Sequence, residues 1–225
     1  MQERKKSGQA IKRIGTYDII HELGKGQFGQ VMLAHKVGDP EDQYAVKVVK
    51  RSMLDSNKKI LELFRTEVKI MKGLNHPNIL KCYDFLDSGD NYYLVINLCK
   101  DGDLEEYINK QPNKRVDEKQ AIFFLQQIMN GFKELGKNKI MHRDFKPANV
   151  FLNGDTVVIG DFGMSKIGVI VAKTHLGTPL TMAPEILFTD QNFKYTNKAD
   201  LWSIGVTFYM LLFGNDGPFP AQDME

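Results

Sequence analysis

Apolar and polar side chains alternate over residues 17–50, which is the two-residue period of β-strands with one buried face. Val31 and Leu33 show this alternation. Asp39-Pro40-Glu41 predicts a turn before a further strand over 44–49. The first part of the chain is therefore predicted to contain several strands connected by turns.

The period changes to that of a helix over about 59–72, and Gly73 and Pro77 mark its end. Apolar residues recur there at spacings of three and four: Leu61, Phe64, Val68 and Met71. A strand-like run follows over 91–97, and Gly102 then breaks the pattern. Residues 97–102 are thus predicted to connect two parts of the chain.

Beyond the connector the pattern is mostly helical, with helices predicted over 104–109 and about 117–137. Short strands over 150–152 and 157–159 are predicted to be joined by a turn at Asn153-Gly154. The apolar run near 204–213 predicts a buried helix, because spanning a bilayer takes roughly 20 residues. These patterns indicate an α+β fold with a mainly β part followed by a mainly helical part.

Composition narrows the class of protein. The chain has 225 residues, 42% of them hydrophobic, and a net charge of +2, which favours neither nucleic acid nor a membrane as partner. Residues 1–16 are basic and are interpreted as a disordered tail, with a targeting or docking arm as the alternative; no signal peptide is expected there, because they lack an apolar core. Only two cysteines, Cys82 and Cys99, are present, which is typical of a reducing, cytoplasmic compartment.

Two acidic motifs carry the strongest chemical signal. His142-Arg143-Asp144-Phe145-Lys146-Pro147-Ala148-Asn149 is followed by Asp161-Phe162-Gly163. One acid placed beside an attacking hydroxyl and a second acid beside a metal are what phosphoryl transfer requires. Either His142-Arg143-Asp144 or Asp161-Phe162-Gly163 alone is weak evidence. Their order and their spacing from Asn149 make the combination specific.

A glycine-rich segment lies early in the chain: Leu23-Gly24-Lys25-Gly26-Gln27-Phe28-Gly29-Gln30-Val31. Glycines let backbone amides approach phosphate groups, because no side chain intervenes. A dinucleotide-binding loop would be followed directly by a helix. Here the strand-like residues 31–34 follow and lead to Ala45-Val46-Lys47, which favours the phosphate loop of a phosphotransferase over a dinucleotide-binding loop or a plain hairpin.

Three further signals are Glu67, Met182-Ala183-Pro184-Glu185 and Asp200-Leu201-Trp202-Ser203-Ile204-Gly205, so that the signals extend in fixed order over residues 17 to about 213. In this the chain resembles the eukaryotic protein kinases. Lys146 resembles the Ser/Thr-specific branch. The sequence of residues 176–181 is similar to that of the autophagy-initiating kinases, with the calmodulin-dependent group as the alternative.

The resemblance implies a two-lobed kinase domain over 17–225, with an N-lobe over about 17–96, a hinge over about 97–102 and a C-lobe over about 103–225. The implied reaction is transfer of the γ-phosphoryl group of ATP, with Mg²⁺, to Ser or Thr of protein substrates. Asp144 is the implied catalytic base and Lys146 the neutralising cation, while Asn149 and Asp161 hold Mg²⁺.

Nucleotide-binding roles are also implied for residues of the N-lobe and hinge. Lys47 would contact the α- and β-phosphates, and Glu67, with Glu62 as the alternative, would hold Lys47 by an ion pair. The remaining assignments are Leu23, Gly24, Lys25, Gly26, Gln27, Phe28, Gly29, Gln30, Val31, Ala45, Asn97 and Cys99. His142 and Phe162 are interpreted as packing residues, together with Met71, Cys82 and Asp200.

Regulation is implied for the segment after Asp161. Thr174 is the candidate phosphosite, and an upstream activating kinase would supply a phosphate that pairs with Arg143. Thr178 is expected to hold Asp144 and Lys146 in place.

Three features depart from the family pattern. Thr181 replaces an aromatic residue, and Ala148 replaces a glutamate, so Asp103 alone is expected to give a weak preference for basic residues in the substrate. Family members also continue with further helices that cover the apolar face of 201–213. We therefore expect an incomplete C-lobe, open to a covering partner. The alternative function is a nucleotide-binding but inactive fragment or pseudokinase that acts as a regulatory binding module.

Overall fold

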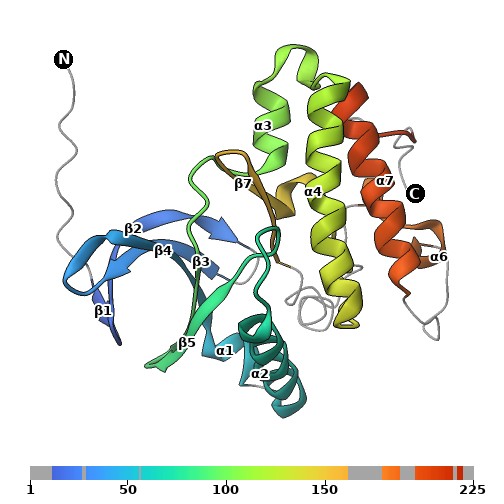
Figure 1. Cartoon of the computed structure of the whole chain (residues 1–225). Helices are drawn as coiled ribbons and strands as arrows, with labels where there is room; N and C mark the ends of the chain where they lie inside the picture. The colour runs from blue at the N-terminus through green and yellow to red at the C-terminus, as the bar shows by residue number, and fades with distance from the viewer. Residues whose placement is uncertain are drawn as a thin grey trace, which may run out of the picture. The chain divides into compact units, whose positions relative to one another are not determined.

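The structure is a computed structural model of the whole chain, and it describes residues 12–26, 29–55, 57–161, 179–187, 196–214 and 217–219. The chain forms two compact units (Figure 1). The sheet unit comprises residues 1–74 and 81–98, and the helical unit comprises residues 75–80 and 99–225. Residues 75–80 therefore belong to the helical unit although they lie between two segments of the sheet unit.

The sheet unit is built on one six-stranded sheet in which every neighbouring pair is antiparallel. In spatial order the strands are β1 (Lys12–Ile14), β2 (Tyr17–Gly26), β3 (Gly29–Lys36), β4 (Asp39–Lys50), β6 (Asn91–Asn97) and β5 (Cys82–Ser88). The strand predicted over 91–97 is confirmed with the same bounds. β5 carried no prediction, because polar residues interrupt its sequence, whereas β6 contains an unbroken apolar run from Tyr92 to Ile96.

Two boundaries differ from the sequence-based expectation. Lys12–Ile14 pairs with β2 and buries Ile14, so the sheet begins inside the range 1–16 that was interpreted as a tail. The turn expected at Asp39-Pro40-Glu41 lies instead at Val37-Gly38, where Gly38 has a φ of 85°. Glycine adopts this left-handed conformation at low cost, which explains why the turn forms there and Pro40 lies within β4.

Two helices belong to the sheet unit: α1 (Arg51–Leu54) and α2 (Lys58–Gly73). The Asn57 side chain caps α2 by accepting from the backbone N–H of Lys59 at 3.0 Å. The buried face of α2 consists of Ile60, Phe64, Val68 and Met71. This confirms the predicted helix and three of its four predicted apolar positions. Ile60 replaces Leu61, which is half-buried.

The helical unit contains α3 (Leu104–Lys110), α4 (Glu118–Lys137), α6 (Pro184–Leu187) and α7 (Asn197–Phe213). Figure 1 shows α7, in red, running alongside α4, in yellow-green. Short 3-10 turns η1 (Pro112–Lys114), η2 (Pro147–Asn149) and η3 (Pro179–Thr181) complete the unit with the hairpin of β7 (Val150–Asn153) and β8 (Thr156–Ile159). No helix within the described ranges is long and apolar enough to cross a membrane.

The core of the helical unit explains why its loops are held in place. Side chains from α3, α4, the β7–β8 hairpin and α7 pack together: Leu104, Ile108, Ala121, Phe124, Ile128, Phe145, Val150, Leu152, Val157, Ile159, Ile204 and Leu211. Phe145 brings the segment before η2 into this core, because its side chain is 1% exposed. The hairpin and the preceding loop are thus fixed on the helices by burial of apolar surface.

Candidate active site

A single acidic side chain holds the backbone at the start of the segment 142–149. The Asp200 carboxylate, in the first turn of α7, accepts from the backbone N–H of His142 through Oδ2 and from that of Arg143 through Oδ1, each at 2.9 Å. Asp200 is buried, so these two charge-assisted bonds form in a region of low dielectric constant. Asp200 thereby fixes the backbone immediately before Asp144.

The ring of His142 is fully buried and ties two segments together. Its Nε2 lies 2.9 Å from the backbone oxygen of Gly160, and the ring packs against Phe132 and Phe145. Burial lowers the pKa of His142 below 6.5, although the carboxylates of Asp200 and Asp144 act in the opposite direction. A neutral, hydrogen-bonded ring is consistent with the packing role expected for His142.

The two carboxylate oxygens of Asp144 have different surroundings. Oδ2 lies 3.3 Å from Nζ of Lys146 and accepts from Nδ2 of Asn149 at 3.2 Å. Oδ1 is buried and has no hydrogen-bond partner among the residues that the structure describes. A buried acceptor without a donor is unfavourable unless another group supplies the hydrogen bond. Oδ1 is therefore the oxygen of Asp144 that is left for a hydrogen bond from a group outside the described residues.

Asn149 is oriented by the backbone of the same loop. Its Nδ2 donates to the backbone oxygen of Asp144 at 2.6 Å, and a carbonyl oxygen can only accept. The amide nitrogen is therefore directed at Asp144, and the amide oxygen is directed elsewhere. The backbone oxygen of Asn149 accepts from the N–H of Gly160 at 2.9 Å, which links this loop to the end of β8.

Asp161 follows β8 and has a φ of 55°, and Arg143 has a φ of 70°. Non-glycine residues seldom adopt this left-handed conformation, which costs on the order of 1–3 kcal/mol. Arg143 directly precedes Asp144, and Asp161 directly follows Gly160, whose N–H is bonded to Asn149; such strain concentrates at functional sites. Phe162, Gly163, the phosphosite candidate Thr174 and Thr178 lie outside the described residues.

The glycine-rich segment lies in the sheet unit and forms the end of the β2–β3 hairpin. Gly24 pairs with Val31, Lys25 with Gln30, and Gly26 with Gly29. A Cβ atom added at Gly29, where φ is 147°, would overlap the backbone oxygen of Val48, so only glycine fits. Gln27 and Phe28 lie outside the described residues. The hairpin, with no helix directly after the glycines, agrees with a phosphate loop and not with a dinucleotide-binding loop.

Lys47 lies in β4 between Val31 of β3 and Leu94 of β6, and its side chain is 6% exposed. A lysine this deeply buried is unusual in a soluble domain and needs a specific role. Ala45, two residues earlier, is also buried on this strand. Glu67 lies half-buried on α2, in the same unit.

The two expected connector residues differ in their surroundings. Asn97 ends β6, where its Oδ1 accepts from the backbone N–H of Lys81 at 2.6 Å and its Nδ2 donates to the hydroxyl of Tyr83 at 3.2 Å. Its side chain is thus occupied within the sheet unit. Cys99 lies in the helical unit, and burial raises the pKa of its thiol to about 11. Cys82 and Cys99 are both free thiols.

The residues expected to face a substrate, Asp103 and Thr181, lie at the start of α3 and in η3. The Asp103 side chain caps α3 by accepting from the backbone N–H of Glu106 at 2.9 Å. Thr181 is buried, and its backbone oxygen accepts from the Ser203 hydroxyl at 2.7 Å. Thr181 and Asp144 line the same small void of about 10 Å³. The threonine therefore packs beneath the loop and does not present a side chain to solvent.

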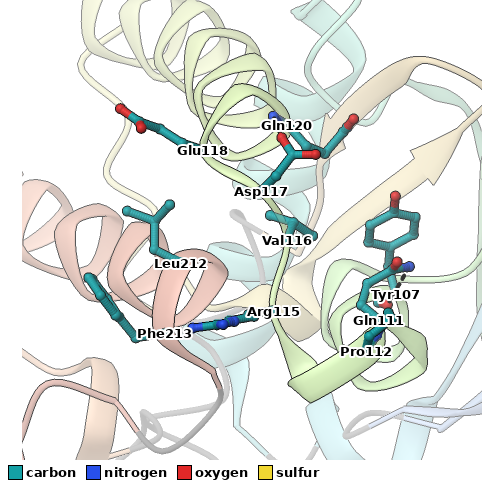
Figure 2. A pocket seen from close by; sticks show the side chains of 10 residues that line it. All are labelled: Tyr107, Gln111, Pro112, Arg115, Val116, Asp117, Glu118, Gln120, Leu212 and Phe213. Atoms are coloured by element: carbon teal, nitrogen blue, oxygen red, sulfur yellow. Dashed lines mark hydrogen bonds between the residues drawn. The ribbon is translucent and has the colours of Figure 1, made fainter.

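A larger cavity of about 660 Å³ lies elsewhere on the helical unit (Figure 2). Its lining residues come from α3, η1, α4, the segments that connect these three elements and the end of α7: Tyr107, Gln111, Pro112, Arg115, Val116, Asp117, Glu118, Gln120, Leu212 and Phe213. None of the predicted site residues is among them, so this cavity is separate from the chemistry expected at Asp144. The described residues contain no group of three or more His, Cys, Asp or Glu that could hold a metal ion.

Within the helical unit, the structure brings together Asp144, Lys146 and Asn149. Hydrogen bonds to Asn149 and His142 hold Gly160, the residue before Asp161, against the same loop. Sequence reasoning missed Asn78 and Gln127, two polar residues that bond to each other and to the backbone of Val157 in β8. Asn78 directly follows Pro77, but no spacing in the sequence indicated that it pairs with a glutamine 49 positions later.

Comparison with known proteins agrees with this architecture. Residues 17–225 match the family described as protein kinase domain, and the chain belongs to this family. Its fold is accordingly the two-lobed α+β kinase fold expected from the sequence, and the resemblance to the protein kinases is confirmed.

Three relatives illustrate the similarity. The serine/threonine-protein kinase atg1 of Dictyostelium discoideum is 38% identical over 224 residues, covering 93% of this chain and 33% of the relative. ATG1a of Arabidopsis thaliana is 35% identical, covering 96% and 34%. A probable myosin light chain kinase of Dictyostelium discoideum is 37% identical, covering 94% and 67%. The chain thus spans about a third of the length of the first two relatives.

Proposed function

We propose that this chain transfers the γ-phosphoryl group of Mg-ATP to Ser or Thr hydroxyls of protein substrates. The observation that carries the proposal is the environment of Asp144. One carboxylate oxygen is held by Lys146 and Asn149, while the other is buried without a partner among the described residues. The names of the similar serine/threonine-protein kinases support the same reaction class.

Asp144 acts in this proposal as the base that accepts the proton of the attacking hydroxyl. A base must lie within hydrogen-bond reach of that proton and be held in position beforehand. Asp200 fixes the two backbone N–H groups that precede Asp144, and Asn149 fixes the Asp144 backbone oxygen. The carboxylate is therefore placed before the substrate arrives.

Asn149 and Asp161 fit a magnesium ion. Because Nδ2 of Asn149 is directed at Asp144, its amide oxygen remains as a hard ligand, and Asp161 supplies a carboxylate. Two protein ligands suffice, since Mg²⁺ usually completes its shell with phosphates and water. When bound, the ion neutralises charge on the phosphate oxygens. Lys146 supplies a further cation beside Asp144 for the transferred group.

Nucleotide binding is assigned to the glycine-rich hairpin over 23–31, to Lys47 with Glu67, and to the connector at Asn97 and Cys99. The hairpin geometry and the burial of Lys47 support the roles of the hairpin and of Lys47. We further propose a cytoplasmic location, since both cysteines are free thiols, and control by an activating kinase acting on Thr174.

The experiment is γ-phosphate transfer from Mg-ATP to a generic Ser/Thr protein substrate, compared with the Asp144→Asn variant. Loss of the base should lower the rate by at least about 10²-fold, while ATP still raises the melting temperature of both proteins. Equal rates in the two proteins would contradict the assignment of Asp144. No transfer by the wild-type chain, with ATP still stabilising it, would support the alternative of a nucleotide-binding regulatory module.

A further inference from the structure

The side-chain amide of Gln127, on α4, makes three hydrogen bonds to two other segments. Its Oε1 accepts from Nδ2 of Asn78 at 2.9 Å and from the backbone N–H of Val157 at 2.9 Å. Its Nε2 donates to the backbone oxygen of Asp155 at 2.8 Å. Gln127 therefore joins α4 to the start of the β8 strand and to the segment 75–80.

Asn78 completes the same network from the other side. Its Nδ2 also donates to the backbone oxygen of Val157 at 2.8 Å, and its own backbone oxygen accepts from Ile159 at 2.9 Å. Leu80 then donates to the backbone oxygen of Ile159 at 2.8 Å. β8 pairs with β7 along one edge, so the segment 78–80 and Gln127 occupy polar groups that a further strand would otherwise pair.

The backbone groups in this network fix the orientation of both amides. The Val157 N–H can only donate, so the Gln127 atom facing it must be Oε1. The Asp155 carbonyl can only accept, so the atom facing it must be Nε2. Turning the Gln127 amide by half a rotation would break all of its bonds at once. The network consequently has one arrangement.

Close packing one helical turn later holds the same segments. A Cβ atom added at Gly131 would lie 2.6 Å from Cδ1 of Ile159 and 2.9 Å from the backbone oxygen of Asn78. The absence of a side chain at Gly131 thus lets Asn78 and β8 approach α4 closely enough for the Gln127 bonds to form.

β8 leads through Gly160 directly to Asp161, the proposed magnesium ligand. Gly160 is held on its other side by its N–H bond to Asn149 and by the ring of His142. We propose that Gln127 is a positioning residue for the phosphoryl-transfer site, acting through β8 to set the place of the Asp161 carboxylate. This inference rests on the proposed function, because it takes Asp161 to be a metal ligand.

A purely structural role for Gln127 would lower stability without changing how nucleotide binding depends on metal. A positioning role predicts a specific change in that dependence, since supporting residues of metal ligands typically contribute about 10- to 100-fold in metal affinity or activity. The two roles are therefore distinguished by measuring ADP affinity with and without Mg²⁺, which needs no turnover.

The test variant is Gln127→Met, which keeps the length of the side chain and removes its hydrogen bonds. The matched control is Gln126→Met, at the neighbouring exposed position of the same helix. In Gln127→Met we expect the gain in ADP affinity on adding Mg²⁺ to fall about tenfold. We also expect amide hydrogen exchange in 156–161 to become about tenfold faster. Gln126→Met should behave as the wild type in both measurements.

An unchanged effect of Mg²⁺ in folded Gln127→Met would overturn the proposal, whether or not exchange becomes faster. Wild-type protein that binds no ADP in the presence of Mg²⁺ would overturn it as well. Wild-type protein that transfers no phosphate but shows the tenfold difference would refute the proposed reaction and leave the positioning role standing. If Gln127→Met does not fold, Gln127→Glu decides by the same measurements, because its carboxylate still accepts from Val157 but cannot donate to the backbone oxygen of Asp155.

Discussion

The ring Nε2 of His142 donates to the backbone oxygen of Gly160 at 2.9 Å. A carbonyl oxygen can only accept, so this nitrogen holds the proton. The Nδ1 atom lies 3.4 Å from the backbone N–H of Asp144 and is the acceptor of that contact. Both contacts are made by the neutral ring, and a protonated ring would place a second N–H against the Asp144 N–H.

This relationship predicts how acid affects stability. Burial lowers the pKa of His142 below its usual 6.5 in the folded protein, whereas in the unfolded chain it returns to that value. Below pH 6.5 the unfolded state therefore binds a proton that the folded state resists, and stability decreases as the pH falls. One such group contributes at most about 1.4 kcal/mol per pH unit.

The measurement is the free energy of unfolding by urea at pH 7 and pH 5, for the wild type and for His142→Gln. We expect the wild type to lose more stability between these values than the variant, even though the variant is less stable at pH 7. Equal losses in the two proteins would mean that the ring of His142 is protonated in the folded state as readily as in the unfolded one.

Two glycines of α4 should respond in opposite ways to alanine. At Gly131 a Cβ atom would meet Ile159 and the backbone of Asn78, so Gly131→Ala is expected to destabilise the protein by about 1–3 kcal/mol. At Gly136 nothing lies within 4 Å, so Gly136→Ala should stabilise it by up to about 1 kcal/mol. Thermal unfolding of the two variants measures the difference. A stabilising Gly131→Ala would show that α4 and β8 are less closely packed than the structure has them.

Much of the fold followed from periodicity alone. The helix predicted over about 59–72 agrees with α2, because its apolar residues form one face, and the strand predicted over 91–97 agrees with β6, because its apolar residues form one short continuous run. The first strand was missed, since Lys12–Ile14 is too short for a period to be visible and follows a basic segment. The turn at Gly38 was placed too late because Pro40 is also a common turn residue.

The candidate site also contains residues that the sequence could predict and residues that it could not. Asp144, Lys146 and Asn149 could be predicted because they lie within six residues of one another, and local spacing survives folding. Gln127 could not be predicted, because its role depends on Asn78 and Val157, 49 and 30 positions away. An isolated glutamine on a helix is usually exposed, so only the tertiary structure shows which one is engaged.

The two cysteines are predicted to react slowly. Burial raises the pKa of the Cys82 and Cys99 thiols to about 11, compared with an unperturbed 9.0. The fraction of thiolate at pH 7.5 is thereby reduced about 100-fold, and thiolate is the reactive form. Iodoacetamide labelling followed by mass spectrometry should show both sites far slower than a model peptide, and equally rapid once urea unfolds the chain. Rapid labelling of Cys99 in the folded protein would contradict its raised pKa.

Asp103 allows two possible roles of one side chain to be separated. It caps α3 through the backbone N–H of Glu106, and it is the acidic residue expected to meet a basic substrate residue. Asparagine caps helices about as well as aspartate but carries no charge. Asp103→Asn should therefore keep the stability of the wild type and remove its modest preference for arginine upstream of the acceptor in peptide substrates.

Asp103→Ala removes the cap as well as the charge. It should show the same loss of arginine preference as Asp103→Asn, together with about 1 kcal/mol lower stability. Thermal unfolding and kcat/KM for matched arginine and alanine peptides provide the two readouts. Because both variants lose the charge and only one loses the cap, a preference lost in Asp103→Ala alone would trace selectivity to the position of α3. A strong arginine preference that survives in both variants would place the selecting acid elsewhere in the chain.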